Sequence, residues 1–254
     1  MGQFSATLQI DPEMVQYKYM TQKKVSEPTR NAAARHKRAP SFAVIMGDIV
    51  DSENTRAGGR LSREFNRSII AANREFHQEL ESPLTITLGD EFQGLAKDLK
   101  KGFRIIEKLR RNLLAVGVDC RFVLGIVQLD SKLNTDNAWN MMGDGLAQAR
   151  AKLNNKKDTN IYRFSILDDQ GHQRLLDAVG LALTILDEGW TVRQRRCVAL
   201  RSEGLSVEVI AKKQRVSARS VYKVLEAARW FYYEEERQAI LFVLAILDVE
   251  WNMT

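Results

Sequence analysis

The chain has 254 residues, of which 44% are hydrophobic and 28% are charged, a composition typical of a soluble globular protein with one or two domains. Its longest apolar runs are shorter than the roughly 18–20 residues that a membrane span needs, and its N-terminus lacks the apolar segment of a signal peptide. We therefore expect a cytoplasmic protein without a membrane partner, in which Cys120 and Cys197 are free thiols. The histidines are too scattered for a zinc site.

The net charge is +6, with an isoelectric point near 9.3. Lysine and arginine are concentrated in two segments, 18–38 and 193–229. A basic balance of this kind favours a polyanionic partner, and the second segment is the better candidate because helical patterning accompanies its charge.

Residues 1–40 are polar and basic, and we expect them to form a flexible arm. From Ser41 onward, apolar residues recur with the periods of strands and helices. We expect strands at 42–47, 84–88, 91–96, 120–129 and 161–166, and helices at about 61–80, 98–115 and 144–154. Pro83 is expected to end the first helix, and Gly89-Asp90 to form the turn of a hairpin.

The resulting order, β-α-β-β-α-β-α-β, predicts an α+β fold in which a mixed sheet carries helices on one face. This is the ferredoxin-like palm arrangement, which we assign to residues 41–168. In that arrangement the first strand lies beside the hairpin, so Asp48 and Asp90 are expected to meet at one end of the sheet.

Two neighbouring carboxylates repel each other, and a divalent cation would neutralise them. The sequence therefore predicts a Mg²⁺ or Mn²⁺ site at Asp48 and Asp90, completed by Glu91. A nucleoside triphosphate or other nucleotide would bring its phosphates to this metal. The alternative is structural, because aspartate at a strand end often caps a helix or forms a turn. The candidate nucleotide-binding residues are Ile49, Val50, Asp51, Ser52, Arg56, Arg60, Gly89 and Arg150, the first four through their backbone amides.

Four motifs, "GDIVDS", "TLGDEFQGL", "RFVLGIV" and "MGDGLAQARAKL", give the segment 42–166 a resemblance to the SatD family of bacterial proteins. The pattern also resembles class III nucleotide cyclases and, in its hairpin, diguanylate cyclases. Those resemblances imply that Asp48, Asp90 and Glu91 bind catalytic metals. The asparagine and arginine of class III cyclases fall on Ala147 and Ala151, with Arg150 one residue away, so the resemblance covers the metal half of such a site and leaves the catalytic residues unknown.

The segment 191–230 predicts three short helices capped by Thr191, Ser206 and Ser217, with Gly204 ending the first. It resembles the helix-turn-helix of LuxR-type regulators and sigma factors, which implies binding to double-stranded DNA. The alternative is a helical module that contacts proteins. The candidate DNA-binding residues are Ser206, Lys212, Lys213, Arg215, Ser217, Ala218, Arg219, Ser220, Tyr222 and Lys223.

The chain ends in a helical pattern, 230–247, whose second half is apolar on nearly every side. This surface must be buried by the chain's own helices or by a second copy, and a homodimer would present two recognition helices to one site. We assign residues 169–254 to an all-α domain that contains the helix-turn-helix and this apolar helix.

Three hypotheses follow. The first is a DNA-binding regulator whose palm domain binds a nucleotide with a divalent metal. The second is a nucleotidyl cyclase or other phosphoryl-transfer enzyme that the helix-turn-helix localises. The third is a degenerate palm that serves only as a dimerisation platform.

Overall fold

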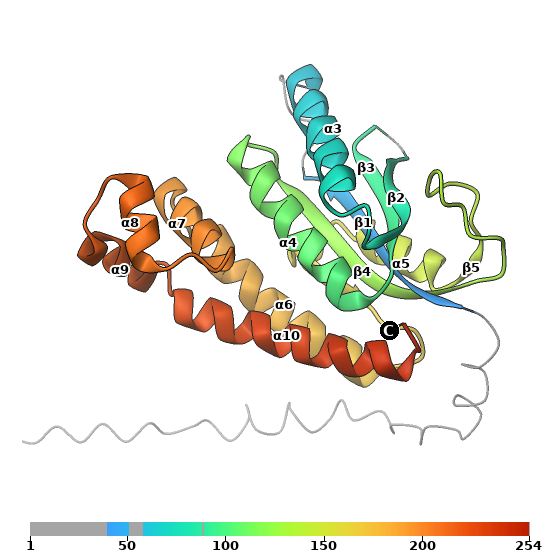
Figure 1. Cartoon of the computed structure of the whole chain (residues 1–254). Coiled ribbons are helices and arrows are strands. Elements are labelled where there is room, and N and C mark those ends of the chain that lie inside the picture. The colour runs from blue at the N-terminus through green and yellow to red at the C-terminus, as the bar shows by residue number, and fades with distance from the viewer. Residues whose placement is uncertain (1–39, 51–57, 88, 254) are drawn as a thin grey trace, which may run out of the picture. The chain divides into compact units, whose positions relative to one another are not determined.

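The structure is a computed structural model that describes residues 40–50, 58–87 and 89–253 (Figure 1). The predicted arm therefore lies outside the described residues except for Pro40. The strands are β1 (Ser41–Ile49), β2 (Leu80–Ile86), β3 (Glu91–Ala96), β4 (Cys120–Leu129), β5 (Gly143–Asp144) and β6 (Tyr162–Ser165). The helices are α3 (Gly58–Glu75), α4 (Leu99–Ala115), α5 (Leu146–Leu153), α6 (Gln170–Glu188), α7 (Val192–Ser202), α8 (Val207–Gln214), α9 (Ala218–Ala227) and α10 (Trp230–Glu250).

The strands form one mixed sheet in the order β2-β3-β1-β4, with β5 and β6 both paired to the far side of β4. All pairs are antiparallel except β4 with β6, which is parallel. β1 is central, and its residues alternate between the two faces of the sheet, as strand geometry requires. The α+β class and the mixed sheet are as predicted.

Helices cover both faces of the sheet, whereas the sequence predicted helices on one face. α3 and α4 pack on the face that carries Ala43 and Ile45, and α5 packs on the opposite face. The second face has its own small core, because Val44 and Met46 of β1 meet Ala149 of α5 there. The short, weakly amphipathic pattern of α5 concealed this second layer.

The first helix is shorter and the second strand longer than predicted. α3 ends at Glu75, and β2 begins at Leu80, so Pro83 lies inside a strand and does not end the helix. β2 is an edge strand with register shifts on both sides of Ser82, which is where a sheet tolerates proline. The Asn73 side chain joins the two elements, because it accepts from Leu84 N and donates to Leu84 O, both at 2.8 Å.

α10 ties the end of the chain to α4. Asp248 is almost fully buried and accepts hydrogen bonds from Leu99 N at 2.7 Å and Lys100 N at 3.2 Å, so it caps α4 from a distant part of the sequence. Near the other end of α10, Arg237 Nε donates to Glu107 Oε1 at 2.7 Å. The predicted boundary near residue 168 falls between β6 and α6, and one hydrophobic cluster continues across it.

Half of the apolar tail is covered by the chain itself. Ile240, Leu244 and Leu247 are buried in the main core, whereas Phe242 and Ile246 are exposed. In the described part of the chain, no helix is both long and apolar enough to cross a membrane.

Candidate functional site

Asp48 stands at the end of β1, on the face that α5 covers. Val44 and Met46 share this face, whereas Gly47 faces the helices on the other side, where a Cβ would clash with the Phe92 ring. Glycine is therefore required before Asp48, and the carboxylate enters the site from a strand that cannot shift without disturbing the core. Asp48 is buried, with 7% of its surface exposed.

The nearest cation to Asp48 is supplied by the chain itself. Arg121 lies opposite Asp48 in the β1–β4 register, and its Nε is 3.3 Å from Asp48 Oδ2. Burial raises the pKa of Asp48 from 3.8 to about 6; Arg121 opposes this increase, and Asp90 and Glu91 add to it. Arg121 Nε is buried and makes no aligned hydrogen bond within the described structure, so its N–H group could still donate to a ligand.

The structure brings the three predicted metal ligands to one end of the sheet. Glu91 is the partner of Asp48 in the β1–β3 register, which places both side chains on the same face. Asp90 precedes it in the hairpin turn and accepts a hydrogen bond from Ile49 N at 3.1 Å through its carbonyl. Gly89 occupies that turn with a φ of 67°, a conformation that favours glycine.

The donor set suits a hard cation, but its geometry fits one only in part. Carboxylate oxygens are the ligands that Mg²⁺ and Mn²⁺ prefer. The carboxylate oxygens of Asp48, Asp90 and Glu91 do not all lie within 4.8 Å of one another. Among the described residues, only Asp169, His172 and Glu250 bring their ligand atoms that close together. Arg121 forms an ion pair with Asp48, so this arginine can reduce the repulsion between the carboxylates without a metal ion. The metal site stays a prediction.

The predicted phosphate-binding segment needs correction where the structure describes it. Ile49 N is bonded to Asp90 O, and Val50 N donates to Asp119 O at 2.9 Å. Amides that are already paired with backbone carbonyls are not free to bind phosphate, and the Ile49 side chain is buried in the core. Asp51, Ser52 and Arg56 lie outside the described residues. Arg60 is exposed in the first turn of α3.

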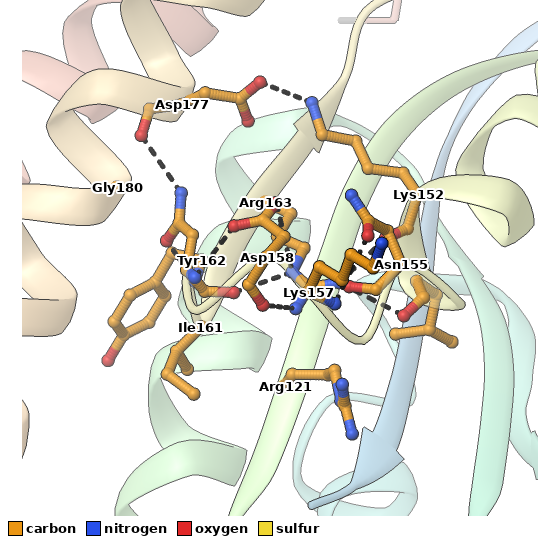
Figure 2. A network of polar contacts seen from close by, with 12 residues as sticks. Arg121, Lys152, Asn155, Lys157, Asp158, Ile161, Tyr162, Arg163, Asp177 and Gly180 are labelled. Carbon is orange, nitrogen blue, oxygen red and sulfur yellow. Dashed lines mark hydrogen bonds and ion pairs between the residues drawn. The ribbon is translucent and has the colours of Figure 1, made fainter.

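A second buried arginine fixes the loop beside this site (Figure 2). Arg163 of β6 is 2% exposed, and its guanidinium donates to backbone carbonyls at the end of α5 and along the loop that joins α5 to β6. Those acceptors are the carbonyl oxygens of Lys152, Leu153, Asn155, Asp158 and Asn160, at 2.5–3.1 Å. The loop also carries Lys156, whose charge acts on Asp48. The Asp48 end of the sheet is thus flanked by Arg121, Arg163 and Lys156.

A cleft of about 650 Å³ opens on the same face of the sheet. Gln93, two residues from Glu91 on β3, lies at its base, donates to Ala138 O at 3.0 Å and accepts from Arg150 Nη2 at 2.9 Å. Trp139, which is 49% exposed, lines the wall. The predicted residue Arg150 therefore does reach this face. A cleft of this size, with an aromatic wall and an arginine, has the dimensions and chemistry of a small-ligand site.

The second candidate site is the outer surface of α7–α9. Thr191, Ser206 and Ser217 are the N-caps of the three helices, as predicted, and Thr191 forms a reciprocal capping box with Gln194. α9 has a strongly amphipathic sequence: Val221 and Leu225 are buried, whereas Arg219, Tyr222 and Lys223 face outward. Val216, in the turn between α8 and α9, is 37% exposed.

Most of the predicted DNA-binding residues are exposed. Among the described residues, no ion pair involves the basic members, which are Lys212, Lys213, Arg215, Arg219 and Lys223. Ser206, Ser217 and Tyr222 are exposed as well, whereas Ala218 and Ser220 are half-buried. Ser220 is engaged by Arg193 of α7, whose Nη2 donates to its Oγ at 2.7 Å, so Arg193 braces the start of α9.

A model of the SatD family matches residues 42–242, which is most of the chain. The chain belongs to the SatD family. The match to SatD extends beyond the segment 42–166 that carries the motifs and includes α6–α9 and the first half of α10. A comparison with curated proteins found no match.

Sequence reasoning about this SatD chain missed Arg121, Gln93 and Trp139. Arg121 and Gln93 could have been found, because each is a polar residue with apolar neighbours inside a largely buried strand. Placing them opposite Asp48 and beside Glu91 requires the strand register, however. Trp139 carries no signal, because it lies in an irregular segment between β4 and β5.

Proposed function

We propose that this SatD-family chain binds double-stranded DNA through a helix-turn-helix made by α7, α8 and α9, with α9 as the recognition helix. The observation that carries the proposal is the set of exposed basic residues on α8, on α9 and between them that have no acidic partner in the described part of the chain. Unpaired surface cations adjoining a helix of suitable polarity supply both the salt-dependent attraction to phosphates and the side chains that enter the major groove.

The helix ends support the same proposal. Ser206 and Ser217 are exposed N-caps, so the positive ends of the α8 and α9 dipoles are open to solvent and could contact phosphates. Tyr222 is 58% exposed, which leaves its ring and hydroxyl available for a base edge or a phosphate.

The test starts from duplexes selected by the protein from a random library, because the target sequence is unknown. Arg219→Ala is expected to weaken binding to the selected duplex by roughly 5- to 100-fold and to relax its sequence preference. Lys212→Ala is expected to weaken binding to every duplex and to reduce the salt slope by about one. Arg104→Ala, an exposed arginine on α4, is the control and should bind normally. A library that yields no enriched duplex would refute sequence-specific binding.

We also propose that the sheet layer is a ferredoxin-like palm that binds a nucleotide, with a divalent metal at Asp48, Asp90 and Glu91. The antiparallel order β2-β3-β1-β4 under α3 and α4 supports the fold, and the cleft beside Gln93 and Trp139 supports the ligand. Arg121 and Arg150 would hold phosphates, Trp139 would contact the base, and the metal would neutralise phosphate charge. The chain would then act as a regulator in which nucleotide occupancy alters DNA binding.

Thermal unfolding with ATP or GTP, with and without Mn²⁺, tests nucleotide binding. It also separates the stabilisation that requires the metal from the stabilisation that Arg121 provides. Asp48→Ala is expected to remove the Mn²⁺-dependent increase in melting temperature, and Arg121→Gln the metal-independent part. Asp136→Ala, on an exposed turn, is the control. No shift with either nucleotide would refute the proposal, and mass spectrometry of the incubated nucleotide distinguishes a sensor from an enzyme.

We propose, finally, that the chain is a homodimer through the exposed apolar stripes of α6 and α10. Leu181 and Ile185 of α6, with Phe242, Ile246 and Val249 of α10, are exposed although each is large and apolar. Neighbouring stripes of this kind are typical of an interface. Sedimentation equilibrium checks it: Phe242→Gln together with Ile246→Gln should convert a dimer to a monomer, and a monomeric unmodified chain would exclude it.

A further inference from the structure

A second cavity, of about 410 Å³, is lined by residues of α4, α6, α7 and α10 and lies away from the Asp48 site and the outer surface of α7–α9. Figure 1 shows where these four helices lie. Its volume lies within the range of small-molecule sites, roughly 300–1,000 Å³. Its walls come from segments far apart in the sequence: the end of α4, the α6–α7 connection, the inner side of α7 and the first turns of α10. The cavity therefore depends on the packing of α7 against the sheet-bearing part of the molecule.

One wall is aromatic and rigid. Trp190 packs edge-on against Tyr233, with their ring centroids 4.8 Å apart. The indole is held in place because its Nε1 donates to Ala228 O at 2.8 Å. A rigid aromatic wall of this kind accepts a planar or apolar group without losing side-chain entropy.

The deep end of the cavity is polar but internally satisfied. Arg110 makes a two-pronged contact with Asp187, at 3.2 Å and 2.9 Å, and Tyr162 Oη donates to Asp187 Oδ2 at 2.7 Å. Arg110 also forms an ion pair with Asp119, so its guanidinium is engaged by two carboxylates. This network shapes the floor of the cavity but offers no free cation to a ligand.

The mouth of the cavity carries positive charge. Arg111, Arg195 and Arg196 line it, and its carboxylate there, Glu203, forms an ion pair with Lys108 at 3.6 Å. Arg195 Nε is buried and has no hydrogen-bond partner within the described structure. A buried donor left unpaired costs about 1–3 kcal/mol, and an anion bound in the cavity would satisfy it.

We infer that this cavity binds a small organic anion that has an aromatic or apolar body, with the body against Trp190 and Tyr233 and the anionic group at Arg195. This inference requires neither the DNA-binding surface nor the metal site, so it can be tested independently of the proposed function.

The probe for the test is anilinonaphthalene sulfonate, whose fluorescence increases in apolar sites, compared with neutral N-phenylnaphthylamine, which has the same aromatic body without the sulfonate. The full chain is expected to bind the sulfonate more tightly than the neutral analogue. Arg195→Met keeps the apolar stem of the side chain and removes the charge. It should weaken sulfonate binding about tenfold or more and leave the neutral analogue nearly unchanged.

Two variants test the place of binding. Ala199→Trp on α7 is expected to fill the cavity and abolish binding of both probes. Val192→Trp serves the same purpose at a lining residue that is 81% exposed, so it remains informative if Ala199→Trp fails to fold.

The matched controls are Arg104→Met, an exposed arginine of α4 outside the cavity, and Phe242→Gln, which alters the exposed apolar stripe of α10. Both should bind the sulfonate like the unmodified chain. Equal binding of sulfonate and neutral probe, unchanged sulfonate binding in Arg195→Met and Val192→Trp, or loss of binding in Phe242→Gln would each overturn the inference.

Discussion

The region around the sheet and the α7–α9 surface differ in whether their basic side chains are buried in ion pairs or exposed without a partner. Around the sheet several charged side chains are buried and paired, such as Arg110 with Asp187 and Arg163 with its backbone carbonyl acceptors. On α8 and α9 the basic side chains point into solvent and have no acidic partner among the described residues.

The difference indicates where binding energy is available. A buried ion pair is already compensated, and removing one partner costs stability because the other charge is left alone. An exposed, unpaired lysine contributes little to folding and is free to attract a polyanion. The same residue type therefore serves structure in one region and recognition in the other, and the effect of its substitution on stability separates the two roles.

The largest expected effect is on the paired side. Arg163→Met leaves several carbonyls of the α5–β6 loop without their donor and is expected to lower the free energy of unfolding by about 3–5 kcal/mol. Lys213→Met on the exposed side is the matched substitution and should change it by less than about 0.5 kcal/mol. Urea unfolding measures both, and similar losses for the two variants would contradict the comparison.

The next effect depends on pH and concerns Asp248. Burial raises its pKa from 3.8 to about 6, although hydrogen bonds from Leu99 N and Lys100 N oppose the shift. Because the folded state holds the proton more tightly than the unfolded state, Asp248 contributes stability that is present below pH 4 and lost as pH rises through 6. The loss is about 2–3 kcal/mol, from roughly two pKa units.

Asp248→Asn keeps the acceptor oxygen for Leu99 N and removes the titration. The difference in unfolding free energy between the variant and the unmodified chain is therefore expected to favour the variant increasingly from pH 4 to pH 7. Asp136→Asn, on an exposed turn, provides the control. If unfolding curves for Asp248→Asn run parallel to those of the unmodified chain at every pH, the assignment to Asp248 is wrong.

A smaller effect concerns how the C-terminal helices are held. Ser217 caps α9 by accepting from Ser220 N at 3.2 Å, and Ser217→Ala is expected to cost about 1 kcal/mol. Ser217→Asn restores an acceptor of the preferred type and should recover most of the loss. Thermal unfolding monitors both variants, and equal stability of the alanine and asparagine variants would show that the cap contributes nothing.

The features predicted well from the sequence are local ones. The caps at Thr191, Ser206 and Ser217, the hairpin at Gly89 and the strand 120–129 each depend on residues close together in the chain, whose preferences are readable directly. The site at Asp48 could be predicted only in part. Its acidic members follow from the motifs, but pairing with Arg121 depends on the register of β1 with β4.

Other features were missed because tertiary contacts override local signals. Pro83 is a strong breaker in isolation, yet an irregular edge strand accommodates it. α5 lies on the second face of the sheet because Ala149 and Leu153 find a small core there, which no periodicity in eight residues predicts. The paired amides of Ile49 and Val50 likewise depend on partners in distant segments.

The most direct test of DNA binding compares two variants that lose the same net charge. One replaces the exposed basic residues of α8, α9 and the turn between them with glutamine: Lys212, Lys213, Arg215, Arg219 and Lys223. The other replaces exposed basic residues outside α7–α9: Arg63, Lys97, Arg104, Lys132 and Lys157.

Fluorescence anisotropy of a labelled duplex, measured over a range of salt concentrations, gives the affinity and the salt slope of each variant. The first variant is expected to lose at least about 100-fold in affinity and most of the salt slope, whereas the second keeps both within about threefold. Equal losses in the two variants would show that attraction arises from net charge alone and would contradict a DNA-binding surface on α8 and α9.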